Sequence, residues 1–202
     1  MAILSFAASN VRAQMGYVAP KTAVTVTIED NSYLKIHGRT NVNSFSCGYR
    51  EEIPKDTLSI SISRMGDKIL LSNAEMKVPV KGLDCGNAMM NSDLQALLKQ
   101  DEHPEIAIRI KSLELSERFA KANETGFIDA GYAVVEFELA GVSKEYRIPI
   151  DSYNELIDQY FLGKKTINIT DFNLSPPKKF LGLVKVEEEI AIDFRLNLNF
   201  LY

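Results

Sequence analysis

The chain has 202 residues, of which 46% are hydrophobic and 25% charged, and this composition is typical of a folded globular protein rather than of a disordered tail. Its 27 acidic and 23 basic residues give a formal charge of −4, so no excess of positive charge is present to neutralise phosphates, and nucleic acid is excluded as an expected partner. Two histidines and two cysteines supply few ligands, so no metal site is expected. No apolar run approaches the roughly 20 residues that a membrane span needs.

The first 16 residues are predicted to be the remnant of a signal peptide. Ala2 to Ala8 is small and apolar, and Val11-Arg12-Ala13 offers small residues where a signal peptidase would accept them. A flexible N-terminal tail is the alternative, because the basic n-region is missing and the apolar stretch is short. We therefore expect one domain over residues 17–202, in a periplasmic or secreted protein.

Alternation of apolar and polar residues with a period of two is the dominant pattern of the chain. It predicts strands that bury one face and expose the other, as in an antiparallel sheet. The turn residues around Gly141 separate two such segments and predict a hairpin. In chain order the alternating segments are Thr22 to Ile28, Leu34 to Ile36, Thr57 to Ser63, Ile106 to Ile110, Val135 to Leu139, Tyr146 to Ile150, Ile167 to Ile169 and Ile190 to Phe200.

One segment departs clearly from this pattern. Ser92-Asp93-Leu94-Gln95 has the form of a capping box and precedes apolar residues, and Pro104 blocks extension, so a short helix of about two turns is predicted. Asn154 to Phe161 is a second, undecided helical segment. Many strands and one inserted helix predict an all-β fold, either a closed antiparallel barrel or a sandwich.

Few residues form a pattern that would support catalysis. His37 is interpreted as a structural or surface residue, and His103, which precedes a proline, as an exposed loop residue. Cys47 and Cys85 are expected to form a disulfide in an oxidising compartment, although two separate buried thiols in a cytosolic protein would also fit the sequence. A thiol enzyme that uses Cys85, with His103 and Asp84, is a third hypothesis, which a disulfide would exclude by consuming the nucleophile. No catalytic residue and no cofactor are therefore expected.

Four stretches of the chain together carry a recognisable pattern: Ser32 to Phe45, Gly86 to Ile106, the hairpin around Gly141, and Thr166 to Phe172 with the strand Val186 to Phe200 after it. They resemble the YceI-like family of periplasmic or secreted lipocalin-like proteins. Two departures from the family pattern are Thr40, where an aromatic usually follows Gly-Arg, and Asp84-Cys85-Gly86-Asn87 at the helix entry, and the two cysteines look like a feature of a subgroup. The resemblance implies an antiparallel eight-stranded barrel that binds polyisoprenoid or related lipids.

The function expected on this basis is noncatalytic binding, storage or transport of an apolar lipid, an isoprenoid or fatty-acyl chain, inside the barrel. A solid barrel that serves as a secreted envelope-stress or interaction module, with its function on loops around Tyr49 or Tyr153, is the alternative, and a homodimer is left open. An eight-stranded barrel is wide enough to be filled by side chains or to hold one ligand. The candidate lining consists of Phe45, Leu58, Ile60, Ile62, Ile108, Ile110, Val135, Phe137, Leu139, Ile148, Ile169, Phe194, Leu196 and Leu198.

Overall fold

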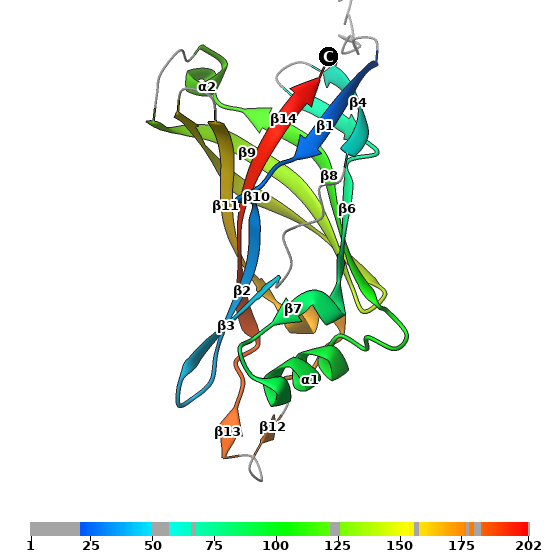
Figure 1. The fold of residues 1–202 in the computed structure, drawn as a ribbon, viewed down its shortest axis with the longest axis vertical. Coiled ribbons are helices and arrows are strands. Elements are labelled where there is room, and N and C mark those ends of the chain that lie inside the picture. Colours follow the sequence, from blue (N-terminus) through cyan, green and yellow to red (C-terminus); the bar gives the residue numbers. More distant parts are fainter. Residues whose placement is uncertain are drawn as a thin grey trace, which may run out of the picture.

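The computed structural model describes residues 21–49, 57–65, 68–121, 126–155, 158–176, 178–179 and 183–201, and these residues form a mostly antiparallel β structure (Figure 1). The predicted signal-peptide remnant lies outside the described residues. The helices are α1 (Ala88–Leu97) and α2 (Glu117–Lys121), with short 3-10 helices η1 (Val80–Gly82) and η2 (Ile169–Phe172). The strands are β1 (Thr22–Ile28), β2 (Tyr33–Arg39), β3 (Ser44–Tyr49), β4 (Thr57–Met65), β5 (Lys68–Ser72), β6 (Glu75–Pro79), β7 (Leu83–Asp84), β8 (Glu105–Leu115), β9 (Gly126–Leu139), β10 (Val142–Glu155), β11 (Asp158–Asn168), β12 (Lys178–Lys179), β13 (Val184–Lys185) and β14 (Glu189–Leu201).

Eight strands close into a ring. They follow the order β1, β4, β5, β8, β9, β10, β11, β14, and every neighbouring pair is antiparallel. The ring closes because β14 also pairs with β1, with Val26 opposite Phe200 and Ile28 opposite Leu198. The predicted eight-stranded antiparallel architecture is confirmed, and the sandwich alternative is wrong.

Two walls of the ring are each built from two successive strands. β1 and β2 both pair with β14, and Asn197 bridges the break between them. Its N–H donates to Ser32 Oγ at 2.9 Å, and its carbonyl accepts the N–H of Glu29 at 2.8 Å. β5 and β6 follow one another along β8 in the same way, with Asn73 at a φ of 63° in the break. Backbone hydrogen bonds continue across both breaks, since the N–H of Ile110 donates to the carbonyl of Ala74 at 2.9 Å across the second.

The helix α1 begins earlier than predicted. Its N-cap is Asn87, an extended residue whose side chain accepts the N–H groups of Met89 at 2.8 Å and Met90 at 3.4 Å. The predicted cap Ser92 therefore lies inside the helix, where its capping role is not needed, and the predicted start was wrong. The cause is that asparagine is as good an N-cap as serine, and the sequence offered both.

Other segments correct the expected boundaries. The undecided segment Asn154 to Phe161 is not helical where the structure describes it, because it ends β10 and begins β11. The alternation from Ile167 to Ile169 overruns its strand: Asn168 caps η2 by accepting the N–H of Thr170 at 2.9 Å, so Ile169 is helical. The helix α2 was not predicted, although Ser116 caps it by accepting the N–H of Phe119 at 3.0 Å. The hairpin at Gly141 is confirmed, with Leu139 opposite Val142.

The outer face of the ring carries a network of charges around Arg109. Its guanidinium pairs with Glu75, with Glu136 at 2.9 Å and with Glu138 at 2.8 Å, so it links three adjacent strands. Glu136 also pairs with Lys111 at 3.2 Å. Hydrogen bonds from Arg109 and then Lys111 lower the pKa of the Glu136 carboxyl. The hydrogen bonds of Arg109 to Glu75, and then to Glu136 and Glu138, raise the pKa of its guanidinium.

Replacing Glu136 with glutamine is expected to lower stability at neutral pH but not in acid. Because the folded-state pKa of Glu136 is depressed, its ion pairs stabilise the fold above the ordinary glutamate pKa, and this contribution is lost as the pH falls through the lowered pKa. The Tm difference between wild type and Glu136→Gln should therefore shrink below about pH 4. Thermal melts across pH check this, with the exposed Glu102→Gln as the control. A difference that does not depend on pH would contradict it.

Candidate ligand-binding interior

The inner face of the ring is mostly apolar because the pairing register sends one alternating row of each strand inward, although this row includes Ser152 and Lys165. In β9, Val135, Phe137 and Leu139 are only 4%, 3% and 6% exposed, whereas Glu136 and Glu138 between them form the outer ion pairs. The register carries the same row across to β8, where Ile108 and Ile110 lie opposite Phe137 and Val135. Alternation therefore separates an apolar interior from a charged exterior.

One end of the ring is filled by packed side chains. The helices α1 and η1 lie at this end (Figure 1), which we call the α1 end. The residues that fill it come from strands and from the short helices alike, and Phe172 of η2 is completely buried. The half-buried Tyr146 also contributes: its hydroxyl donates to Asp171 at 3.0 Å, and burial, followed by the nearby Asp171, raises its pKa to about 12. Most of the interior at this end is packed core, as in an ordinary globular protein.

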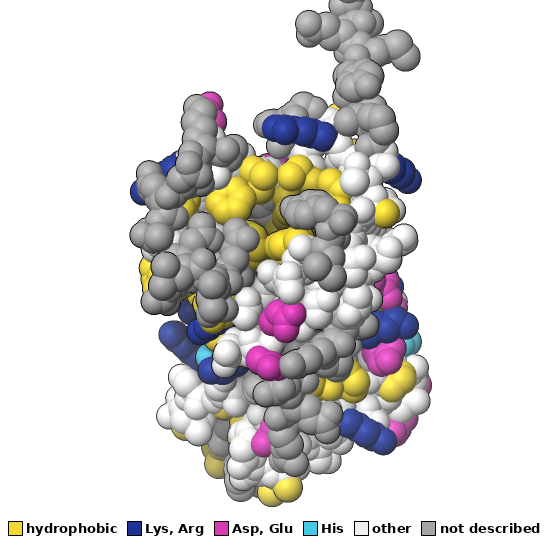
Figure 2. Space-filling view, turned by 45° about the horizontal axis from the view of Figure 1, so that its top comes forward, with side chains coloured by type: hydrophobic (Ala, Val, Ile, Leu, Met, Phe, Trp, Pro, Cys, Tyr) yellow, Lys and Arg dark blue, Asp and Glu magenta, His cyan; other side chains and the backbone are white. Residues whose placement is uncertain are grey.

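The opposite end of the ring, where α2 lies, is open. Several side chains there point inward by register and belong to the hydrophobic clusters, yet they remain half-buried rather than buried. A side chain that faces the interior and still meets solvent borders a space that its neighbours do not fill. Figure 2 looks toward this end and shows apolar side chains gathered inside it. We call this space the recess, and it is lined by Leu58, Ile62, Leu71, Ile110, Leu113, Phe161, Phe194, Leu196, Leu198 and Phe200.

The buried side chains around the recess fall into two clusters. The smaller one comprises Val24, Val26, Ile60 and Ala74, and the larger one holds most of the other buried hydrophobic residues. Among the described residues, the two clusters share only partly buried neighbours, Ile110 and Leu198. The buried side chains of the two clusters are therefore not packed directly against each other, as they would be in a filled ring. The recess lies where their contact is missing.

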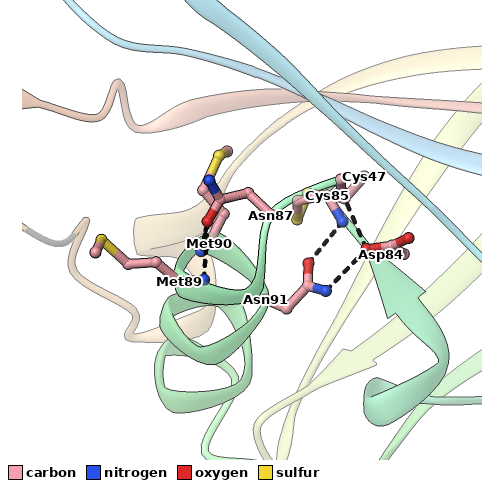
Figure 3. The surroundings of a disulfide bond; sticks show 8 residues. Cys47, Asp84, Cys85, Asn87, Met89, Met90 and Asn91 are labelled. Carbon is pink, nitrogen blue, oxygen red and sulfur yellow. Dashed lines mark hydrogen bonds between the residues drawn. A yellow bond between two sulfur atoms is a disulfide. The ribbon is translucent and has the colours of Figure 1, made fainter.

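The disulfide between Cys47 and Cys85 is present, as predicted. It joins β3 to the residue after β7, with an S–S distance of 1.98 Å, and Cys47 is 1% exposed. Figure 3 shows Asn91 of α1 turned toward this bond. Its side chain accepts the N–H of Cys85 at 2.7 Å and donates to Asp84 at 2.8 Å. The disulfide therefore anchors the start of α1 to the sheet at the α1 end.

The bonded sulfur of Cys85 offers no thiolate in this oxidised state, so the chemistry proposed for a thiol enzyme is not available to it. His103 is half-buried rather than exposed, contrary to the prediction, because its ring covers Gly141, where a Cβ would lie 2.6 Å from its Cε1. His37 lies on the outer face with its Nε2 3.7 Å from Asp193. Neither histidine faces the recess.

The family model for the YceI-like domain matches residues 17–198. The chain belongs to the YceI-like family. No curated protein matches it. Among solved structures, Burkholderia cenocepacia BcnA is 14% identical with a TM-score of 0.58, and the match covers 85% of this chain and 99% of that one. A polyisoprenoid binding domain from Saccharophagus degradans is 11% identical with a TM-score of 0.53, over 87% of this chain and 97% of that one. These likenesses show a shared fold.

Most of the predicted lining lies on the inner face of the YceI-like ring, in two groups. Leu58, Ile62, Ile108, Ile110, Phe194, Leu196 and Leu198 are half-buried, and all but Ile108 border the recess. The others are buried and belong to the core, namely Ile60, Val135, Phe137, Leu139 and Ile148.

Two predicted lining residues lie off the ring. Phe45 belongs to β3, where its ring covers Gly38, and a Cβ there would lie 2.8 Å from Cε2 of that ring. Ile169 lies in η2 because β11 ends one residue earlier, and its side chain is 3% exposed. Period-two alternation finds inward-facing residues, but it does not tell a ring strand from a flanking strand or from a helical turn.

Several recess residues were not predicted. Leu113 follows an irregularity in the pairing of β8 with β9, between Ile110 and Ser112, that breaks simple alternation. Leu71 ends the apolar run Ile69-Leu70-Leu71 of β5, which does not alternate. Phe161 lay in the segment that was undecided between helix and strand. Phe119 of α2 reaches the same region, since its ring meets that of Phe161 at a centroid distance of 6.2 Å. The sequence signal that could have predicted α2, and with it the position of Phe119, is the capping residue Ser116.

In the part of the chain that the structure describes, no helix is both long and apolar enough to cross a membrane.

Proposed function

We propose that this YceI-like protein binds an apolar lipid tail in the recess, as a noncatalytic carrier or store in the periplasm or outside the cell. The observation that supports this most directly is the row of inward-facing apolar side chains that remain half-buried at the α2 end. A soluble protein rarely leaves such surface in contact with water unless something covers it. A lipid tail bound in the recess would cover this apolar surface and would itself be removed from water.

The size of the driving force favours a long chain. Each methylene removed from water contributes about 0.8 kcal/mol, so a tail of several carbons would offset the entropy cost of binding. A polyisoprenoid is the class that we propose, because the similar domain from Saccharophagus degradans is described as polyisoprenoid binding. Its branched methyl groups would pack against Ile, Leu and Phe side chains such as those around the recess.

Organic extraction of the purified protein followed by mass spectrometry tests the proposal directly. We expect an apolar lipid at a near-stoichiometric amount, and displacement of bound cis-parinaric acid by a long polyprenol but not by a short alcohol. Repeated extraction without lipid, together with no fluorescence response to cis-parinaric acid, would overturn it.

The alternative, an interaction module, would use the outer surface. It was predicted for loops, but Tyr49 and Tyr153 both lie in strands, β3 and β10. The ring of Tyr153 packs at a tilt against that of Phe127, with the centroids 4.7 Å apart, and Phe127 is 69% exposed on the outer face. A Phe127→Ser variant therefore separates the two readings of a probe signal: binding in the recess should survive it, whereas binding to the outer aromatic pair should not.

A further inference from the structure

Gly163 occupies an inward-facing position in the middle of β11, where a β-branched or aromatic residue would ordinarily be favoured. Its φ is not positive, unlike those of Gly126, Gly131 and Gly141, so the backbone conformation does not call for glycine. The reason for glycine must therefore be space. Glycine inside a strand often marks a place where another group approaches closely.

The group that approaches is the ring of Phe194, the residue directly opposite on β14. A Cβ at Gly163 would overlap Cζ of Phe194 and would lie 2.7 Å from its Cε1. The tip of the ring thus rests on the backbone of β11, as aromatic residues do when they cover a cross-strand glycine. The ring lies along the wall instead of projecting into the interior.

The neighbours of Phe194 leave its ring one direction in which to move. On the far side of β11, Ile150 lies opposite Gly163, is 8% exposed, and places its Cδ1 3.0 Å from the same Cβ position. On the other side of β14, Leu34 lies opposite Phe194 and is 5% exposed. Both flanks are packed, whereas the half-buried inner side of Phe194 borders the recess. A ring displaced from Gly163 would enter the recess.

We propose that Gly163 is a positioning residue that keeps the recess open by seating the Phe194 ring against the wall. This inference rests on the proposed function, because it assigns a specificity role within the same lipid site. A methyl group at position 163 would push the ring inward and narrow the space available to a lipid tail. Binding would weaken although no ligand contact is removed.

The test compares Gly163→Ala with wild type in titrations with cis-parinaric acid and with the bulkier N-phenyl-1-naphthylamine. Displacing about two methylenes of tail from the wall corresponds to roughly a tenfold rise in Kd. The double variant Gly163→Ala with Phe194→Ala removes the ring and should return the Kd for cis-parinaric acid to within about threefold of wild type. Gly48→Ala is the matched control, since its Cβ would meet Lys35 Cγ at 3.8 Å and the carbonyl oxygen of Leu34 at 3.9 Å, which are ordinary contact distances.

Each outcome separates this inference from the proposed function. Wild type that binds neither probe overturns the lipid site itself. Wild type that binds, with Gly163→Ala binding equally well, overturns the positioning role alone, and so does a double variant as weak as Gly163→Ala. If Gly163→Ala does not fold, Phe194→Ala in the wild-type background decides: it should favour the bulkier probe over cis-parinaric acid, and an unchanged ratio of the two Kd values overturns the inference.

Discussion

Replacing Cys47 and Cys85 together with alanine is expected to lower the free energy of unfolding by about 4 kcal/mol. The bond closes a loop of 38 positions, and on the chain-entropy model the unfolded state gains this much freedom when such a loop opens. For a chain of this length the loss corresponds to a Tm lower by about 8 to 16 °C. Thermal or denaturant melts of the variant and the wild type measure it.

A reductant distinguishes the disulfide from the packing of the two side chains. Wild type should lose most of the same stability when it is reduced, whereas the double alanine variant should not respond. Ligand binding at room temperature should survive in the variant, because the bond lies at the filled α1 end rather than in the recess. Equal melting temperatures for oxidised wild type and the variant would contradict the prediction, and so would loss of an enzymatic activity without loss of stability, which the thiol hypothesis requires.

The sequence predicted the inner face of the fold better than its boundaries. Alternation depends on the two-residue repeat of a strand, which is local, so residues such as Ile110 and Leu198 were placed correctly on the inner face. The start of a helix depends on which of several nearby residues caps it. Asn87 rather than Ser92 caps α1, and the alternation of apolar and polar residues carries no information about that choice. Ile169 was misplaced because a capping asparagine ended its strand.

The distinction between filled and open interior could not be predicted from residue types. Ile148 and Ile110 are both inward-facing isoleucines, yet the first is completely buried and the second half-buried. What differs is how closely side chains from other parts of the chain pack against each of them. The short helices fill one end, and their side chains meet the sheet only through contacts between distant parts of the chain. The role of Gly163 could not be predicted for the same reason, since it depends on contact with Phe194, which lies 31 residues later in the chain.

Replacing Leu198 with aspartate is expected to weaken lipid binding by roughly 100-fold, since bound lipid would strip water from an unpaired carboxylate. Leu198 suits this test because it is half-buried and contacts both hydrophobic clusters around the recess. Its half-exposed state lets water solvate the new charge in the unliganded protein, so the fold should survive with a loss of about 1 to 3 kcal/mol. Titration with cis-parinaric acid measures the binding.

Two further variants separate binding from stability. Asn199→Asp places the same charge one residue along β14 on the exposed outer face, and it should change neither binding nor Tm appreciably. Ile167→Val lowers stability by about 1 kcal/mol in the filled half of the ring, where Ile167 is 2% exposed, and it should leave binding intact. If Leu198→Asp and Asn199→Asp weaken binding equally, the tail does not enter the ring, because only a ligand inside it distinguishes two adjacent residues that point to opposite faces of one strand.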